Sequence, residues 1–164
     1  MRKIGCLEKV LINNLPKDWR IEELNKCGKI VTGKTPSKKI EEYWNSSDIS
    51  FIKPDDFNKH TIIEFDKGKD FISYEGFKKA TKIPPYSVLV TCIGNIGNIL
   101  INKNEATTNQ QINSIIPNKD IHYKYLAYAI KKIKPINAKN DRPPKRYSFF
   151  TAVRSFGLNL ILII

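Results

Sequence analysis

The chain has 164 residues, of which 41% are hydrophobic, enough for one domain with a buried core but short for two complete domains. Lysine and arginine total 28 against 16 for aspartate and glutamate, a formal net charge of +12. This excess is spread along the chain, so we expect a basic surface that attracts polyanions such as nucleic acid. A lysine-rich background composition with solvated lysines explains the charge equally well.

The cysteines and the apolar segments argue against several classes of protein. Cys6, Cys27 and Cys92 are odd in number and widely spaced, which fits neither a disulfide framework nor paired zinc ligands. The sequence has no charged-then-apolar leader, and its longest apolar stretch, residues 158–164, is too short to span a bilayer. We therefore expect a cytoplasmic protein without a membrane role.

The N-terminal half predicts a peripheral arm, a short helix and several strands. Residues 1–14 carry only a weak helical pattern and are expected to form the arm. Apolar spacing of three at Ile21, Leu24 and Cys27 predicts a short amphipathic helix, with Gly28 available to close it. Residues 32–37 are expected to form a loop. Three apolar segments after it predict strands, at residues 48–58, 62–65 and 71–74. Pro54 stops the first of these strands, and the last runs into a helical turn.

The C-terminal half contains the strongest strand signal, SVLVTCI at residues 87–93, whose β-branched run is typical of burial on both faces. GNIG at residues 94–97, followed by NILIN, predicts a hairpin or tight corner whose glycines supply positive φ. INSIIPN predicts a further strand, and residues 123–134 an amphipathic helix. The fold class expected is α+β: a strand-rich domain over residues 15–135 with short peripheral helices, then an atypical C-terminal segment, residues 136–164.

Residues 28–35, GKIVTGKT, match the phosphate-binding pattern G-x-x-x-x-G-K-[ST] letter for letter. Such a loop must follow a buried strand and open a helix, so that backbone N–H groups point at the phosphates. Here the preceding segment is charged and helical in period, and Pro36 stands where the helix would be in its first turn. A P-loop-like nucleotide-binding enzyme is kept as the alternative function, while Lys34 and Thr35 are favoured as contacts to a DNA phosphate.

The tripeptide PPY at residues 84–86 matches part of the adenine methyltransferase motif. That motif needs Asp, Asn or Ser before the prolines, but Ile83 stands there, and no glycine-rich loop suited to S-adenosylmethionine is evident. A rigid turn before the next strand is therefore the favoured interpretation.

Two further patterns fall short of a catalytic or metal site. Pro54-Asp55 begins the pattern of a metal-dependent nuclease, but no D/E-x-K triplet follows it. Asp55 and Asp56 are expected to begin a turn or cap a helix. His60 and His122 lack the spacing of a zinc helix and are interpreted as ordinary surface or half-buried histidines.

Three segments occur in a specific order: TGKTPSKKIEEYW at residues 32–44 running into DISFIKPDDF, SVLVTCIGNIG at 87–97, and TNQQINSIIP at 108–117. Together they resemble a target recognition domain of the specificity subunit of type I restriction-modification systems. LPKDW at residues 15–19 and KYLAYAIKK at 124–132 are also similar to that family. The ordered series is much more specific than any one piece.

The resemblance implies a strand-rich α+β domain that reads one half of a split target in double-stranded DNA. In the family, two such domains are separated by long helices, and the specificity subunit docks methyltransferase (M) subunits that modify adenine with S-adenosylmethionine. A restriction (R) subunit driven by ATP cleaves unmodified DNA. The expected chain is therefore non-catalytic and holds no cofactor, with S-adenosylmethionine, ATP and Mg in the partner subunits.

The sequence departs from the family pattern in two ways. It holds one recognition domain, and it lacks the long spacer helix that should follow. Residues 140–156 do not resemble the family, although LNLILII echoes an apolar strand that precedes the spacer. A fragment, a frameshifted gene and a half-length subunit that forms a homodimer all remain open.

DNA binding needs phosphate contacts for position and base-edge contacts for sequence. Lys34, Lys38 and Lys39 supply cations beside Tyr43 and Trp44, and we expect this loop to contact phosphates. The competing interpretation makes the two aromatic residues core anchors, and for Trp44 it is the favoured one.

Four amides are candidates for the recognition surface. Asn109, Gln110 and Gln111 can grip adenine through paired donor and acceptor groups, and Asn95 lies in a glycine-flanked loop where backbone can approach DNA closely. For the glutamine pair, an equally good interpretation is that the amides tie loops together. Family members with different targets share such a TNQQ segment, which argues that it builds the framework rather than reading bases.

Overall fold

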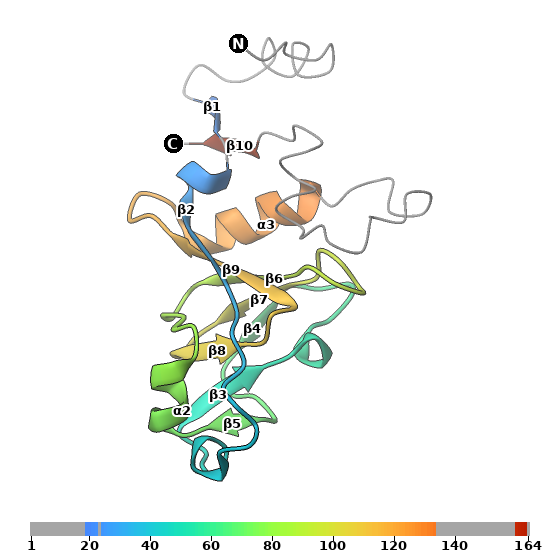
Figure 1. Ribbon diagram of the computed structural model, residues 1–164. Helices are drawn as coiled ribbons and strands as arrows, with labels where there is room; N and C mark the ends of the chain where they lie inside the picture. The colour runs from blue at the N-terminus through green and yellow to red at the C-terminus, as the bar shows by residue number, and fades with distance from the viewer. Residues whose placement is uncertain (1–18, 23, 134–159, 164) are drawn as a thin grey trace.

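The computed structural model describes residues 19–22, 24–133 and 160–163, which form a strand-rich α+β domain (Figure 1). A five-stranded sheet has the spatial order β2 (Gly28–Thr32), β9 (Ile112–Pro117), β6 (Val88–Thr91), β7 (Ile99–Asn102) and β4 (Ile63–Phe65). A three-stranded sheet has the order β5 (Phe71–Ile72), β3 (Ile49–Ile52) and β8 (Ala106–Thr108). The predicted fold class is confirmed.

The remaining elements lie around these two sheets. The described helices are α2 (Tyr74–Lys79), beside the smaller sheet, and α3 (Tyr123–Ile133), which covers the larger one (Figure 1). Short 3-10 turns occur at Leu24–Lys26, Glu41–Tyr43 and Pro54–Asp56. Strands β1 (Trp19–Glu22) and β10 (Leu160–Ile163) pair with each other in an antiparallel manner.

Strand β6 is the centre of the core, and all four of its residues are buried. It pairs antiparallel with β9 on one edge and with β7 on the other. Alternate side chains serve two faces: Val88 and Val90 pack toward α3, whereas Leu89 packs with Ile52 of the second sheet. The predicted strand at residues 87–93 is confirmed, and its continuous apolar run reflects cover on both faces.

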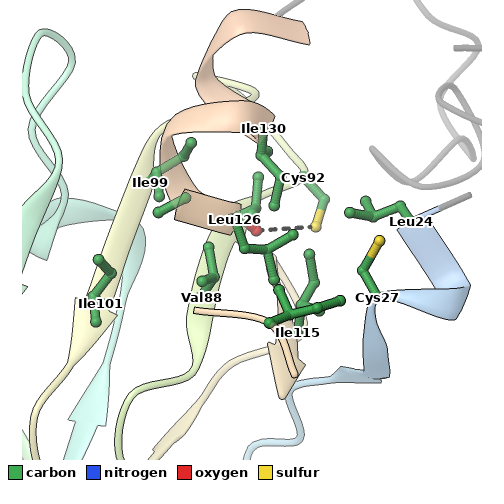
Figure 2. Packing of buried hydrophobic residues seen from close by; sticks show 12 residues of the cluster. Leu24, Cys27, Val88, Cys92, Ile99, Ile101, Ile115, Leu126 and Ile130 are labelled. Atoms are coloured by element: carbon green, nitrogen blue, oxygen red, sulfur yellow. Dashed lines mark hydrogen bonds between the residues drawn. The ribbon is translucent and has the colours of Figure 1, made fainter. Parts of the chain in front are cut away.

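Helix α3 closes the upper face of the five-stranded sheet (Figure 2). Leu126 and Ile130 project from the helix onto Val88, Ile99 and Ile115 of the strands. Their spacing of four places both on one side of the helix, as the sequence pattern predicts. The described helix extends to Ile133, and the predicted last residue, Lys134, lies outside the described residues.

The predicted helix over residues 21–27 is wrong. Ile21 lies in β1, opposite Ile161 of β10, and only the 3-10 turn Leu24–Lys26 is helical. Gly28 does not close a helix but begins β2, where a Cβ atom would lie 2.3 Å from the Ile116 carbonyl oxygen. The apolar spacing of three does not reflect a helix. Leu24 and Cys27 are apolar because both side chains are buried in the core beneath α3.

Other predicted elements are present with shorter bounds. Strand β3 stops at Ile52, and the following turn is closed by Asp56, whose Oδ2 accepts a hydrogen bond of 2.8 Å from the Lys53 backbone N–H. Residues 94–97 join β6 and β7 as a hairpin, and Gly94 and Gly97 adopt φ of 71° and 80°. The sequence did not predict β2 or β8. The expected arm at residues 1–14 and most of the atypical segment at 136–164 lie outside the described residues.

Leu126→Ala tests the core. Leu126 is fully buried between α3 and the sheet, so its truncation is expected to lower the free energy of unfolding by about 2–5 kcal/mol. Tyr128→Ala on the same helix removes a side chain that is 60% exposed and is expected to cost no more than about 0.5 kcal/mol. Urea denaturation measures both, and equal losses would contradict the packing described.

The ion pair between Lys124 of α3 and Glu64 of β4 gives a second prediction. The two side chains lie 2.6 Å apart, and the hydrogen bond and charge of Lys124 hold the pKa of Glu64 below its ordinary value. Because this pKa is lower in the folded state, the stabilisation it brings is present at neutral pH and is lost as the pH falls through it. Lys124→Gln is expected to raise the pKa of Glu64. This pKa is measured by NMR, from the chemical shift of the Glu64 carboxyl carbon as a function of pH. Lys119→Gln is the control and should leave that midpoint in place.

Candidate nucleic-acid interface

Three connecting segments leave the five-stranded sheet at the same end. Thr32, the last residue of β2, lies opposite Asn113 of β9, and Thr91, the last residue of β6, lies opposite Ile112, the first of β9. Residues 33–37, 92–98 and 109–111 therefore begin or end side by side. We call these three segments the loop cluster.

Hydrogen bonds join the members of the loop cluster directly. The Gly33 backbone N–H donates to the Ile112 carbonyl over 3.1 Å, and the Cys92 N–H donates to the Gln111 carbonyl over 2.8 Å. The Thr35 hydroxyl donates to Oε1 of Gln110 over 2.8 Å. The structure thus brings together predicted site residues that lie about 75 positions apart in the chain.

The three amides at residues 109–111 have different surroundings. Asn109 and Gln111 are half-buried and bond to each other, since Asn109 Nδ2 donates to Gln111 Oε1 and the Gln111 N–H donates to Asn109 Oδ1, both over 3.0 Å. Gln110 is exposed at the turn between them. Two amides therefore hold the turn, and the third is presented to solvent.

Lys34, Lys38 and Lys39 are exposed on the segment that follows β2. Within the described part of the chain, none of the three forms an ion pair. Lys34 lies in the loop cluster, whereas Lys38 and Lys39 form a turn further along. Uncompensated ammonium groups on one connected segment produce a local positive potential.

Trp44 fixes the segment that carries these lysines. Its indole N–H donates to the Ser37 carbonyl over 3.0 Å, and its ring meets that of Phe51 edge-on, with centroids 5.1 Å apart. Trp44 packs against the buried cluster that includes Ile49 and Phe77, so the interpretation as a core anchor is confirmed.

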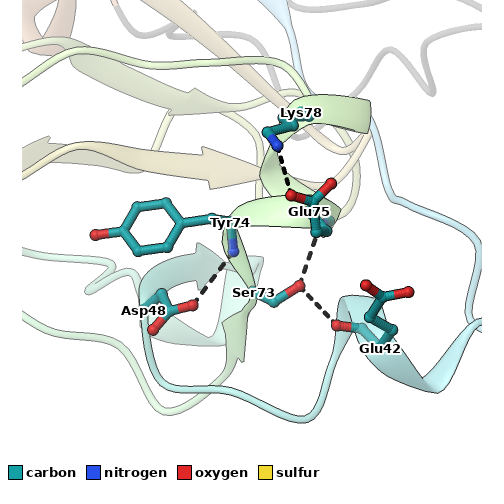
Figure 3. Close-up of polar contacts among 7 residues, drawn as sticks. Glu42, Asp48, Ser73, Tyr74, Glu75 and Lys78 are labelled. Carbon is teal, nitrogen blue, oxygen red and sulfur yellow. Dashed lines mark hydrogen bonds and ion pairs between the residues drawn. The ribbon is translucent and has the colours of Figure 1, made fainter.

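Tyr43 is half-buried and is held through its backbone at the start of α2. Its carbonyl accepts the Ser73 N–H over 3.0 Å. The Ser73 hydroxyl donates to the Glu42 carbonyl (Figure 3) and accepts the Gly76 N–H. Gly76 packs so closely that a Cβ atom there would lie 2.7 Å from the Tyr43 carbonyl oxygen. Ser73 thereby caps α2 and fastens the lysine-bearing segment to the smaller sheet.

Beside this segment lies a groove of about 450 Å³, lined in part by Lys38, Trp44 and Phe51. Lys53 and Asp70 form an ion pair of 2.5 Å in its wall. The hydrogen bond to Asp70 raises the pKa of Lys53 above its ordinary value. The groove is thus mixed in charge, unlike the loop that carries the three lysines.

Asn95 is exposed at the tip of the β6–β7 hairpin, between Gly94 and Gly97. The Thr91 hydroxyl donates to the Asn95 carbonyl, which fixes the backbone of the tip and leaves the side-chain amide outside the hairpin. Apart from atoms of Gly94 and its two neighbours in the chain, no atom lies within 4 Å of the position that a Cβ at residue 94 would occupy. Another molecule can therefore approach this backbone closely.

The segment GKIVTGKT does not form a nucleotide-binding loop. Its first five residues are β2 itself, an edge strand antiparallel to β9, and residues 33–40 contain no helix. Backbone N–H groups at Gly33 and Lys34 consequently do not lie between a parallel strand and a helix N-terminus.

The other short motifs behave as the favoured interpretations predicted. PPY at residues 84–86 forms a turn before β6. His60 and His122 are both exposed.

Among the described residues, no group of three or more acidic, histidine or cysteine side chains is arranged to hold a metal ion. Neither described helix has the length and apolar character that crossing a bilayer requires.

Local sequence patterns did not reveal that Thr81 and Asn113 position the loop cluster through Thr32. The Thr81 hydroxyl donates to the Thr32 carbonyl over 2.8 Å, and the Thr32 hydroxyl donates to Oδ1 of Asn113 over 2.8 Å. These contacts depend on strand pairing between distant segments, which local patterns do not reveal.

These features define a basic α+β domain in which the loops at one end of a sheet present an exposed lysine and exposed amides. Residues 16–151 match the type I restriction modification DNA specificity domain family. Because this match covers most of the chain, the chain belongs to that family.

Curated relatives agree with this assignment. The MjaIX specificity subunit of Methanocaldococcus jannaschii is 35% identical over 122 residues, 73% of this chain and 28% of the relative. The HindI specificity subunit of Haemophilus influenzae is 34% identical over 120 residues, 72% of this chain and 26% of the relative. The EcoR124I/EcoR124II specificity subunit of Escherichia coli is 30% identical over 119 residues, 69% of this chain and 28% of the relative. The chain thus spans little more than a quarter of these relatives.

Two solved structures share the fold. A chain from a study of complex assembly and conformational transition in the type I R-M system superposes with a TM-score of 0.59 at 17% identity, over 77% of this chain and 30% of that chain. The HsdS subunit from Thermoanaerobacter tengcongensis gives a TM-score of 0.53 at 16% identity, over 73% of this chain and 30% of that chain.

Gly33→Ala tests the crossing at the centre of the loop cluster. A Cβ at position 33 would lie 2.0 Å from the Asn109 carbonyl oxygen and 2.1 Å from the Thr108 hydroxyl. We expect the free energy of unfolding to fall by about 1–3 kcal/mol and the amide NMR signals of residues 109–112 to shift. Gly94→Ala is the control, because its site is open although its φ is positive; it should leave those signals unchanged. An unaltered spectrum for Gly33→Ala would contradict the close approach.

Proposed function

We propose that this domain binds double-stranded DNA in a sequence-specific manner as part of the specificity subunit of a type I restriction-modification system. The observation that carries the proposal is the loop cluster with the turn that follows it: exposed Lys34, Lys38 and Lys39, which form no described ion pair, stand on a segment that is hydrogen-bonded to a turn presenting an amide. Family membership supports the same conclusion. The domain itself performs no chemistry and serves to position partner subunits on DNA.

Phosphates are contacted by the lysine-bearing segment in this proposal. Lys34, Lys38 and Lys39 neutralise backbone charge, and binding gains free energy from the counterions that are released. Thr35 acts indirectly, because its hydroxyl is engaged with Gln110. Tyr43 supports the segment through its backbone contacts with Ser73.

Sequence is read by the two exposed amides rather than by the two that are hydrogen-bonded to each other. Asn95 and Gln110 are exposed and can form hydrogen bonds to base edges or to the backbone. Asn109 and Gln111 already satisfy each other and belong to the framework. This division accounts for the two interpretations of the TNQQ segment, since one of its amides is presented while its neighbours are structural.

The chemistry of the system belongs to partner subunits in this proposal. A methyltransferase subunit carries S-adenosylmethionine and modifies adenine, and a restriction subunit uses ATP and Mg to drive cleavage. A second recognition domain, or a second copy of this chain, supplies the other half of a split target. These are soluble partners, and the complex acts in the cytoplasm.

Two measurements test the proposed function. The purified chain is expected to select one short motif from a library of random duplexes, and its affinity for any duplex should fall steeply as salt increases. Failure to enrich a motif, or binding that does not respond to salt, would falsify the proposal.

Lys34→Ala and Gln110→Ala separate a charged contact from a neutral one. Loss of one phosphate contact is expected to reduce the slope of log affinity against log salt by about 0.9 for Lys34→Ala. Gln110→Ala removes a neutral donor and should weaken binding while leaving the slope in place. Lys119→Ala, at the opposite end of β9, is the control for an exposed lysine outside the loop cluster. Unchanged binding by both loop variants would place the interface elsewhere.

A further inference from the structure

The segment that leads into β4 lies at the same end of the five-stranded sheet as the loop cluster (Figure 1). Strand β4 pairs with β7 in parallel, Ile63 opposite Leu100, and β7 begins at Ile99, directly after the β6–β7 hairpin. Because parallel strands begin at the same end of a sheet, residues 58–62 enter β4 beside that hairpin.

Hydrogen bonds and packing hold this segment in place. Asn58 Oδ1 accepts the backbone N–H groups of His60 and Thr61, over 2.8 Å and 3.2 Å. Side chains that bond to the backbone in this way fix a turn. Ile62 packs against the core cluster beneath α3. The segment is thus anchored both within itself and to the body of the domain.

A hollow of about 120 Å³ lies between this turn, the hairpin and the end of α3. Lys59 of the turn, Gly97 of the hairpin and Lys131 of the helix are among the residues that line it. The Lys131 ammonium donates to the His60 carbonyl over 2.7 Å, which holds this cation at the hollow. An ammonium has three N–H donors, so two of them remain for another ligand.

The two lysines make the hollow positive. Lys59 is exposed and Lys131 is half-buried, and within the described part of the chain neither forms an ion pair. No carboxylate is among the described residues that line the hollow. Two uncompensated ammonium groups with available donors favour an oxyanion such as phosphate.

Position, rather than charge alone, distinguishes these lysines. Exposed lysines also occur at the other end of the sheet, among them Lys119 after β9. Lys59 and Lys131 instead lie beside the hairpin that presents Asn95, on the side away from Lys34. Lys34 follows the edge strand β2, whereas Lys59 precedes the other edge strand, β4. Four strand spacings separate the two edges, about 19 Å.

This arrangement suits the major groove of a duplex. The major groove is about 12 Å wide and admits a two-stranded β-ribbon, whereas the minor groove, about 6 Å wide, is too narrow for one. A hairpin in the major groove has the backbone of one strand on each side. Cations at the two edges of the sheet are far enough apart to reach both backbones.

We propose that Lys59 and Lys131 form a second phosphate-binding site, on the DNA strand opposite the one that Lys34 contacts, with the β6–β7 hairpin in the major groove between the two backbones. The inference rests on the proposed function and adds to it a site at the other edge of the sheet. Phosphate contacts fix the orientation of a protein on the duplex. Contacts on both strands would thus set which base edges Asn95 faces.

The test measures the affinity of the full chain for the duplex motif that it selects, with one phosphate at a time replaced by an uncharged methylphosphonate. The parent chain is expected to lose about threefold or more in affinity at phosphates of both strands. Lys34→Ala should abolish this response on one strand only, and Lys59→Gln and Lys131→Gln on the other strand only. Each glutamine variant should also reduce the slope of log affinity against log salt by about 0.9. Lys119→Gln is the control and should keep both responses and the slope.

Two results would overturn the proposal. One is a Lys59→Gln chain with the phosphate responses of the parent, and the other is loss of response on the same strand in Lys34→Ala and Lys59→Gln. If Lys131→Gln lowers the thermal stability, Lys59→Gln decides, because Lys59 is exposed. A parent chain that binds no duplex, or selects no motif, contradicts the proposed function itself. A parent chain that selects a motif and then fails either comparison contradicts only the second site.

Discussion

Strand β9 is hydrogen-bonded along both edges, and the rest of the domain depends on this double pairing. β2 lies on one side and β6 on the other, both antiparallel to it. Since antiparallel neighbours reverse direction, the end of β2, the start of β9 and the end of β6 meet at one place. A slip of register by one residue would move Ile112 and Ile115 to the opposite faces of the sheet, away from the two clusters in which they pack, and would separate the loops that form the candidate interface.

Charge compensation differs from place to place on the surface of the domain. Lys34, Lys38 and Lys39 stand on a segment where no described carboxylate pairs with them. Lys124 and Lys103, by contrast, pair with Glu64 and Asp66. The net charge of +12 is therefore an incomplete description of the molecule. Local pairing decides where a polyanion gains most from the surface.

Polar side chains that bind their own framework are not available to a ligand, and this distinction refines the candidate site. Asn109, Gln111 and Asn102 all spend their amides on internal hydrogen bonds. Asn95 and Gln110 remain exposed. Residue type alone gave all five the same capacity to bind a base. Exposure and hydrogen-bond partners together separate those that shape the loops from those that face outward: Gln110 uses its Oε1 to accept the Thr35 hydroxyl, and its side chain is nevertheless exposed.

The sequence by itself determined the family, the strand-rich α+β class, the buried strand β6 and the amphipathic helix α3, because these follow from local apolar periodicity and an ordered series of motifs. Tertiary structure decided the rest. Residues 21–27 have helical spacing, yet Ile21 pairs with β10 from the other end of the chain. Strands β2 and β8 arise from pairing between distant segments, and so does the hydrogen bond from Thr35 to Gln110. No local sequence window contains the energies of these contacts.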